Sequence, residues 1–207
     1  TQEQSQNINK VKEHYKLLKS VSFSDNFKSN SEIKEIFGAS TCRLVWFFTQ
    51  KESQNYKKAE KYFKILESNS TNSYFENDLK VNENFSLAMF NLSSFFTNKE
   101  TRNIIKAVFY FKKSKKLCSK KYFENESNIN LDFAKITYNL CWCFTQKESK
   151  NFKEAEKYLN TLQVLCSKES FKENTEINLE FAKASCQLSW FFCENETIKT
   201  KGAKKYY

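Results

Sequence analysis

Cysteine, histidine and glutamate are the residues of this sequence whose types could support nucleophilic, metal-binding or acid–base chemistry. Cys141 and Cys143 are separated by one residue, whereas zinc knuckles use two, and the single histidine, His14, lies far from both. A cysteine or serine nucleophile also needs a base close by. We therefore predict no catalytic residue, no metal site and no cofactor, and hence a protein that is not an enzyme.

Four glutamates recur at an interval of 48 residues, and His14 occupies a position that is tyrosine at the same interval. Packed helices lie about 10 Å apart, which is too far for carboxylates of successive repeats to form a catalytic pair. We predict that the glutamates instead cap helices, favoured by the helix dipole, and that His14 is a packing residue. The glutamates are Glu52, Glu100, Glu148 and Glu196, and the tyrosines are Tyr62, Tyr110 and Tyr158.

Seven cysteines, an odd number, are scattered through helical stretches, which argues against a disulfide framework. We expect Cys141 and Cys143 to be small buried thiols in a protein of a reducing, cytoplasmic compartment. Glycine occurs only twice, so no glycine-rich phosphate loop is present. The cysteines are Cys42, Cys118, Cys141, Cys143, Cys166, Cys186 and Cys193.

The formal net charge of +10 suggests RNA or DNA binding as an alternative, because lysines that neutralise phosphates give a salt-sensitive affinity. Only Arg43 and Arg102 among the 34 basic residues are arginine, the side chain suited to bidentate recognition of phosphates and base edges. The lysine-rich runs at 112–116 and 199–205 belong to single repeats. We therefore favour a solvated lysine surface and rank nucleic-acid binding second.

The elements that must position these residues are expected to be helices. The sequence has no proline, two glycines and 21 phenylalanines, a composition with few turns and few helix breakers. No stretch approaches the roughly 18 to 20 consecutive apolar residues that a membrane-spanning helix needs. An all-α protein without a membrane span is the expectation.

Six columns of identical residues, the glutamates included, recur every 48 residues without a gap. A fixed period of 20 to 50 residues is typical of stacked structural repeats. The other five columns are Leu44, Leu92, Leu140 and Leu188; Phe48, Phe96, Phe144 and Phe192; Ala59, Ala107, Ala155 and Ala203; Phe27, Phe75, Phe123 and Phe171; and Phe37, Phe85, Phe133 and Phe181.

One repeat contains two predicted helices joined by a short polar turn. The spacing of apolar residues predicts a first helix over about 130–146 and a second over about 151–168. The connector to the next repeat carries Phe123 or Phe171, which we expect to fill the groove between repeats. We also predict that an asparagine column supplies the N-caps of the first helices. This column is Asn82, Asn130 and Asn178.

Each helix pair has an apolar face that only a neighbouring pair can cover, which predicts an α-solenoid of stacked antiparallel helix pairs. We expect one array over 1–207 without polar capping repeats, so that it is a piece of a longer array or has ends covered by neighbouring subunits. Its repeat limits are a partial repeat at 1–33, with a second helix and connector, full repeats at 34–81, 82–129 and 130–177, and a partial repeat at 178–207.

The segment YNLCWCFTQKESKNFKEAEKYLNTL resembles a tetratricopeptide repeat, and more loosely a Sel1-like repeat. Its turn is about two residues longer than usual and lacks the usual glycine, and 48 residues exceed the usual 34. The resemblance implies a right-handed superhelix whose first helices line the concave side. It rests on Leu140, the small residue Cys141, Phe144, Ala155 and Leu159, with Val45, Ser93 and Ser189 in the small-residue column of the other repeats.

If the first helices line a groove, as the resemblance implies, an extended peptide or a partner helix would dock there. We therefore predict a scaffold for protein–protein interaction, with RNA or DNA binding and self-association through uncapped ends as alternatives. A further alternative is that the tryptophans only pack between neighbouring first helices. The predicted groove residues are Arg43, Trp46, Phe90, Asn91, Tyr138, Asn139, Trp142, Gln146, Gln187 and Trp190, with Cys42 and Cys186 beside them.

Overall fold

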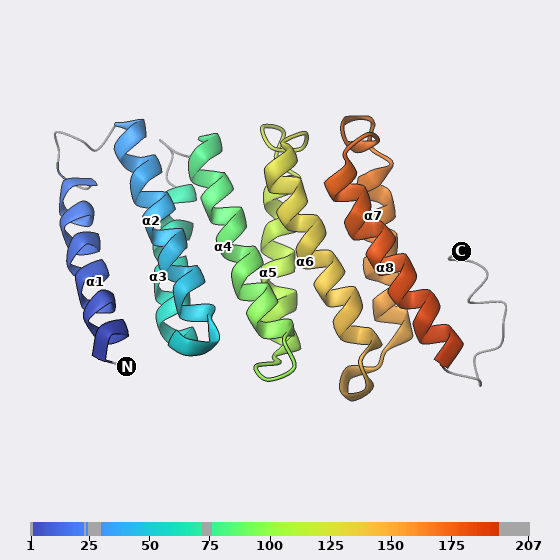
Figure 1. Ribbon diagram of the computed structural model, residues 1–207. Helices are drawn as coiled ribbons and strands as arrows, with labels where there is room; N and C mark the ends of the chain where they lie inside the picture. The colour runs from blue at the N-terminus through green and yellow to red at the C-terminus, as the bar shows by residue number, and fades with distance from the viewer. Residues whose placement is uncertain (1, 23, 25–29, 72–75, 195–207) are drawn as a thin grey trace. The chain divides into compact units, whose positions relative to one another are not determined.

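A computed structural model describes residues 2–22, 24, 30–71 and 76–194. Within these ranges the protein is all-helical, as predicted, and contains no strand (Figure 1). The α-helices are α1 (Gln2–Ser22), α2 (Ser31–Thr49), α3 (Tyr56–Ser70), α4 (Leu79–Thr97), α5 (Ile104–Cys118), α6 (Ser127–Thr145), α7 (Phe152–Cys166) and α8 (Thr175–Glu194). The short 3₁₀-helices are η1 (Lys51–Ser53), η2 (Lys147–Ser149) and η3 (Glu169–Phe171). The predicted positions Phe27, Phe75, Glu196 and Ala203 and the run 199–205 lie outside the described residues.

The chain divides into two compact units, Thr1–Ala88 and Met89–Tyr207, and the boundary falls inside α4. In the first unit, α2 packs against α1 and α3. In the second unit, α6 packs against α5, α7 and α8, and α7 also packs against α8. Neighbouring helices therefore pack on one another within each unit, while the repeat limits given above stay a prediction.

One pair of stacked aromatic rings recurs at the 48-residue interval. In each pair, the ring of a second helix lies against the ring of the following first helix, with the planes inclined by 21°, 24° and 28°. Such an aromatic pair contributes about 0.5–1.5 kcal/mol beyond the area that it buries. The same contact therefore stabilises the packing of each second helix on the first helix that follows it. The centroid distances are 5.5 Å for Tyr15–Phe37, 5.3 Å for Phe63–Phe85 and 5.4 Å for Phe111–Phe133.

The repeated apolar columns form the core, as predicted. Burying one leucine or phenylalanine contributes about 1.5–3 kcal/mol, so these columns supply much of the packing energy. The small-residue column is buried as well, which lets the two helices of a pair approach closely. The buried members are Leu44, Leu92, Leu140 and Leu188; Phe48, Phe96, Phe144 and Phe192; Ala59, Ala107 and Ala155; Phe37, Phe85 and Phe133; and Val45, Ser93, Cys141 and Ser189. Phe181 is half-buried.

The predicted N-caps of the first helices are wrong, because each helix begins about one turn earlier. Asn130 lies inside α6 and is fully buried, and its side-chain amide donates to the carbonyl oxygens of Phe123 and Glu126, both at 2.9 Å. It therefore ties the preceding connector to the helix. The side chains that cap the first helices of other repeats are Asn30, Asp78 and Asn174, which accept from the amides of Ile33, Val81 and Ile177 at 3.0, 2.9 and 3.0 Å.

The second helices are capped by asparagine and not by the predicted glutamates. The side-chain oxygen of Asn151 accepts from the backbone amide of Glu154 at 3.2 Å, and the backbone amide of Asn151 donates to the carbonyl oxygen of Phe144 at 2.9 Å. Asn55 and Asn103 make the same two bonds. The glutamate at position 148 lies in η2 instead, in the turn before the cap.

The connector phenylalanines are enclosed, as predicted. Phe123 is 1% exposed and Phe171 is fully buried. The ammonium group of Lys120 lies 5.9 Å from the Phe123 ring centroid, and that of Lys168 lies 5.6 Å from the Phe171 centroid. These rings therefore anchor connectors that are otherwise polar.

Candidate functional site

The predicted groove residues lie on the first helix of each pair or at its end. Those on α2, in the first compact unit, are described separately from the eight in the second unit. Arg43 and Trp46 lie on α2; Phe90 and Asn91 on α4; Tyr138, Asn139 and Trp142 on α6; Gln146 at the C-cap of α6; and Gln187 and Trp190 on α8.

Asparagine and glutamine side chains join successive first helices in the second unit. The amide nitrogen of Asn139 donates to the hydroxyl of Ser94 at 2.9 Å, which links α6 to α4. The amide nitrogen of Gln187 donates to the hydroxyl of Thr145 at 3.2 Å, which links α8 to α6. Both side chains thus hold the first helices beside one another.

Lysine side chains of one first helix lie over aromatic rings of the preceding first helix. The ammonium group of Lys135 lies 5.7 Å from the Phe90 ring centroid, and that of Lys183 lies 5.8 Å from the Tyr138 centroid. Both rings are half-buried, and burial raises the pKa of the Tyr138 phenol above its ordinary value. Lys183 also pairs with Glu180 at 2.8 Å. The face therefore combines partly open aromatic rings with positive charge.

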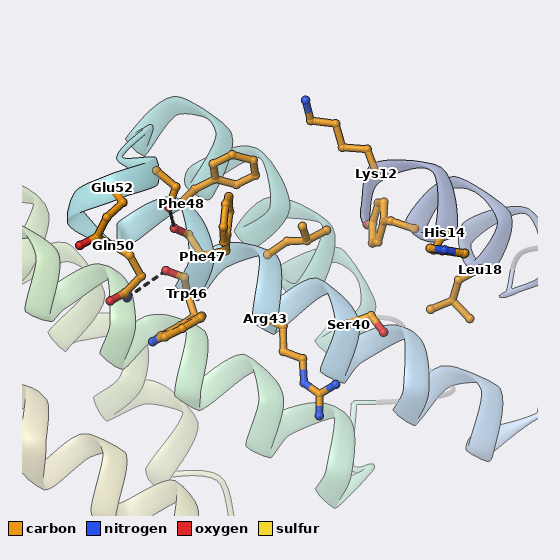
Figure 2. Close-up of a pocket in the computed structure, with 13 residues that line it drawn as sticks. Lys12, His14, Leu18, Ser40, Arg43, Trp46, Phe47, Phe48, Gln50 and Glu52 are labelled. Atoms are coloured by element: carbon orange, nitrogen blue, oxygen red, sulfur yellow. Dashed lines mark hydrogen bonds between the residues drawn. The ribbon is translucent and has the colours of Figure 1, made fainter. Parts of the chain in front are cut away.

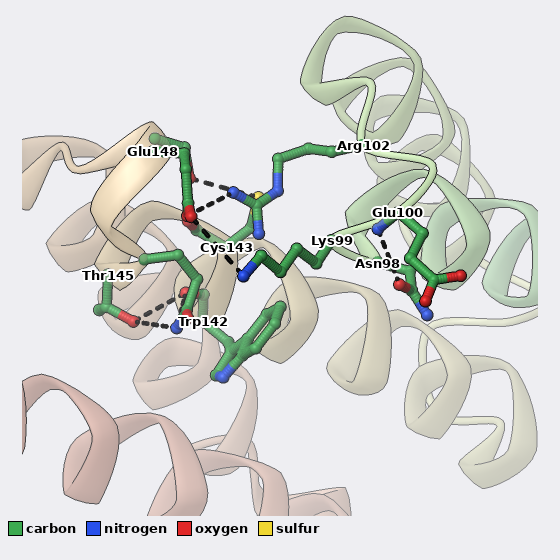
Figure 3. Close-up of polar contacts among 10 residues, drawn as sticks. Asn98, Lys99, Glu100, Arg102, Trp142, Cys143, Thr145 and Glu148 are labelled. Carbon is green, nitrogen blue, oxygen red and sulfur yellow. Dashed lines mark hydrogen bonds and ion pairs between the residues drawn. The ribbon is translucent and has the colours of Figure 1, made fainter.

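The three tryptophans lie near the C-terminal ends of α2, α6 and α8, and the equivalent position on α4 is Ser94. Trp142 is half-buried, whereas Trp46 is 51% and Trp190 63% exposed. The carbonyl oxygen of Trp142 accepts from the Thr145 hydroxyl at 2.7 Å and from the Gln146 amide at 3.2 Å (Figure 3). These bonds close the helix end and leave the indole ring outside the fully enclosed core.

An ion pair that the sequence analysis did not predict joins two turns of the second unit. Glu148 accepts from the Arg102 guanidinium at 3.3 Å and lies 4.0 Å from the Lys99 ammonium group (Figure 3). A hydrogen bond from its own backbone amide, followed by Arg102, lowers the pKa of the Glu148 carboxyl. The Arg102 side chain is 13% exposed and the Glu148 side chain 55% exposed, so the pair lies at the surface.

A cavity of about 880 Å³ lies between α1 and α2 in the first unit (Figure 2). Its walls include Leu18 from α1 and Arg43 and Phe47 from α2. His14 also lines the cavity and is exposed, so the prediction of a packing residue is wrong. The neighbouring Tyr15 on α1 is 8% exposed and enters the core.

All seven cysteines are free thiols. Cys141 and Cys143 are buried, as predicted, and Cys42 is 3% exposed, so its predicted place in the groove is wrong. Burial raises the pKa of Cys118 and of Cys141 to about 12, which makes both thiols unreactive at neutral pH. Among the described residues, no three His, Cys, Asp or Glu side chains gather where they could hold a metal ion.

No family model, curated protein or solved structure compared with this chain gives a match. None of the described helices combines the length and apolar character needed to cross a bilayer.

Proposed function

We propose that this chain is a cytoplasmic, non-enzymatic scaffold for protein–protein interaction, which binds an extended segment of a partner along its first helices. The observation that carries the proposal is Trp142 on α6, which is half-buried instead of being enclosed (Figure 3). Tyr138, about one turn earlier on the same helix, is half-buried as well. Aromatic side chains with an accessible face are frequent centres of binding energy at interfaces.

The proposed architecture is a right-handed α-solenoid of the tetratricopeptide type. It is supported by the packing of neighbouring helices within each unit and by aromatic contacts that recur at the 48-residue interval. In arrays of this kind the first helices line a concave surface. The side chains joined along that surface are those of Ser94, Asn139, Thr145 and Gln187.

The charge of the chain favours an acidic partner segment. The formal net charge is +10, and Lys135 and Lys183 place ammonium groups against the rings of Phe90 and Tyr138. A segment with carboxylates beside apolar side chains would meet both features. Complementary charge of this kind mainly increases the association rate and the sensitivity of binding to salt.

The test uses acidic peptides selected from a displayed library against the wild-type chain. Replacing Trp142 by alanine should weaken their binding at least tenfold, a loss of about 1.4 kcal/mol, while the helical circular dichroism stays close to wild type. The matched control is Tyr122→Ala, which removes an aromatic side chain that is 64% exposed and lies outside this surface. Equal binding by wild type and Trp142→Ala, or a collapse of helical content in Trp142→Ala, contradicts the proposal.

Nucleic-acid binding is the second candidate, favoured by a lysine cluster on α5. Lys112, Lys115 and Lys116 are exposed there, and Lys113 lies 4.8 Å from the ring centroid of Phe109, which is 48% exposed. Lysines beside an open ring are typical of single-stranded nucleic-acid binding. A fluorescent single-stranded RNA should then bind with an affinity that falls steeply with salt, and no binding at low salt would exclude this candidate.

A further inference from the structure

The cavity between α1 and α2 is lined by positions that are closed in later repeats. Ser40 and Phe47, on the α2 wall, are both half-buried. Their equivalents at the 48-residue interval on α6 and α8 are covered, because another first helix lies beside each of these helices. Those equivalents are Ile136, Cys143 and Ala184, each fully buried, and Phe191, 4% exposed.

The α1 wall of the cavity is open in the same way. Leu18 is half-buried and His14 is exposed. The residues that replace Leu18 in later repeats are Leu66, Ser114 and Leu162, all fully buried, and those that replace His14 in the second unit are Tyr110 and Tyr158, 2% and 1% exposed. The cavity is therefore the place that a first helix occupies in the later repeats.

The helix α8 carries the complementary surface. One stripe along it is exposed and mostly apolar, whereas the equivalent stripe on α6 is half-buried or buried where α8 packs. An exposed apolar stripe of this length is typical of an interaction surface. Its residues are Leu179, Ala182, Cys186, Trp190 and Cys193 on α8, and their equivalents are Leu131, Ala134, Tyr138, Trp142 and Thr145 on α6.

We propose that the cavity between α1 and α2 receives α8 of a second copy of this chain. In this contact α2 takes the place that α8 has against α6 within one chain, and the second copy's α8 takes the place of α6. Two hydrogen bonds between first helices within the chain set the register. At the 48-residue interval, Arg43 is equivalent to both Gln187 and Asn139. The Gln187–Thr145 bond therefore corresponds to a contact of Arg43 with Cys193 of the second copy. The Asn139–Ser94 bond corresponds to a contact of Arg43 with Trp190 of the second copy.

The side chains at this contact suit one another. Arg43 is exposed on the cavity wall, and Trp190 is 63% exposed on α8. A guanidinium group against an indole ring is the most favourable kind of cation–π contact and does not need a hydrogen-bond partner. The small side chains Cys186 and Ala182 allow α8 to approach closely. The two faces differ, so association is head to tail and adds further copies at either end.

The first test measures the mass of the full 207-residue chain in solution. Sedimentation equilibrium should show the mass rising with concentration from 24.6 kDa towards multiples of it. Arg43→Glu and Trp190→Ala should each lower the association constant at least tenfold while keeping the wild-type unfolding midpoint, because both side chains are exposed. A strictly monomeric wild type at all concentrations overturns the proposal.

Mixing the two variants makes the test specific to this pair of faces. Arg43→Glu retains an intact α8, and Trp190→Ala retains an intact cavity. An equimolar mixture should therefore recover one contact and form a heterodimer that does not grow further. A wild type that associates beside a mixture that stays monomeric places the contact elsewhere and overturns the proposal.

Cross-linking tests the register. In Arg43→Cys, a short bis-maleimide should join position 43 of one copy to Cys193 of another, and Cys193→Ser in the same background should abolish that link. Lys57→Cys, exposed on α3, is the matched control and should give no link to Cys193. A link from position 43 to other cysteines alone contradicts the register. Trp142→Ala should not alter the association of the chain with itself. The test of self-association and the test of partner binding at Trp142 can therefore fail independently.

Discussion

The ring of Tyr158 on α7 meets the ring of Phe111 on α5 edge-on, with centroids 5.0 Å apart and planes at 89°. Tyr158 also stacks on Phe144 at 5.8 Å. The relationship recurs in the first unit, where Tyr15 meets Tyr62 at 5.2 Å and 89°. One ring thus joins the second helices of successive repeats and also packs on the first helix of its own repeat.

Tyr158→Ala should be strongly destabilising, because the ring is 1% exposed and contacts two other helices. We expect a loss of about 3–5 kcal/mol in the free energy of unfolding, measured by urea denaturation. Tyr158→Phe keeps the ring and should lose much less. The control Tyr122→Ala, at an exposed ring, should cost under about 0.5 kcal/mol. Comparable losses for the two alanine variants would contradict this packing role of Tyr158.

Asn151→Ala tests the cap of the second helix. The change removes the acceptor for the Glu154 amide and should lower the free energy of unfolding by about 0.5–2 kcal/mol. Asn151→Asp retains an acceptor and should remain close to wild type. Lys153→Ala, at an exposed position in the same first turn, is the control. An unchanged urea midpoint in Asn151→Ala would show that water satisfies this helix end equally well.

Features that recur in every repeat can be predicted from the sequence. Features that belong to one repeat alone cannot be predicted from the 48-residue pattern. The invariant columns identify the core because every repeat must bury the same face. Arg102, in contrast, is Gln54 and Lys150 at the equivalent positions, so periodicity cannot reveal its bond to Glu148. His14 also departs from its column of tyrosines, and it is exposed where Tyr110 and Tyr158 are buried.

Asparagine explains the error in the helix starts. Its side chain can accept from an unpaired amide, as Asn151 does, or donate to a carbonyl, as the buried Asn130 does. Spacing alone does not distinguish these two roles, because both columns recur every 48 residues. Burial decides between them, and it depends on how the connector folds over the helix.

Glu148→Gln should cause a small, pH-dependent loss of stability. The pKa of the Glu148 carboxyl is lowered in the folded chain, first by its backbone amide and then by Arg102. The stabilising effect of the ionised Glu148 carboxylate is therefore fully present above the pKa that this group has in the unfolded chain. It is lost as the pH falls through the pKa of the folded chain. The unfolding midpoints of wild type and variant should differ at pH 7 and converge in acid. Glu173→Gln, which removes a carboxylate at another exposed position, is the matched charge control.

The buried thiols should make the chain less stable in alkali. The pKa of Cys141 is raised by burial from 9.0 to about 12, so the folded chain keeps its proton where the unfolded chain loses it. The stabilising effect is complete below about pH 9 and is lost as the pH rises to about 12, up to about 4 kcal/mol at 1.36 kcal/mol per unit. Urea unfolding between about pH 7.5 and about 10.5 measures how steeply the free energy of unfolding falls with pH.

Cys141→Ser provides the matched comparison for this slope, because serine already occupies the equivalent positions Ser93 and Ser189. The variant should lose some stability at pH 7 through the buried hydroxyl, and its free energy of unfolding should fall less steeply in alkali. Cys186→Ser, which makes the same change at an exposed thiol, is the control. If Cys141→Ser and Cys186→Ser show equal slopes, the buried thiol of Cys141 does not control the alkaline loss, and another group with a raised pKa, such as Tyr158 at about 12, must account for it.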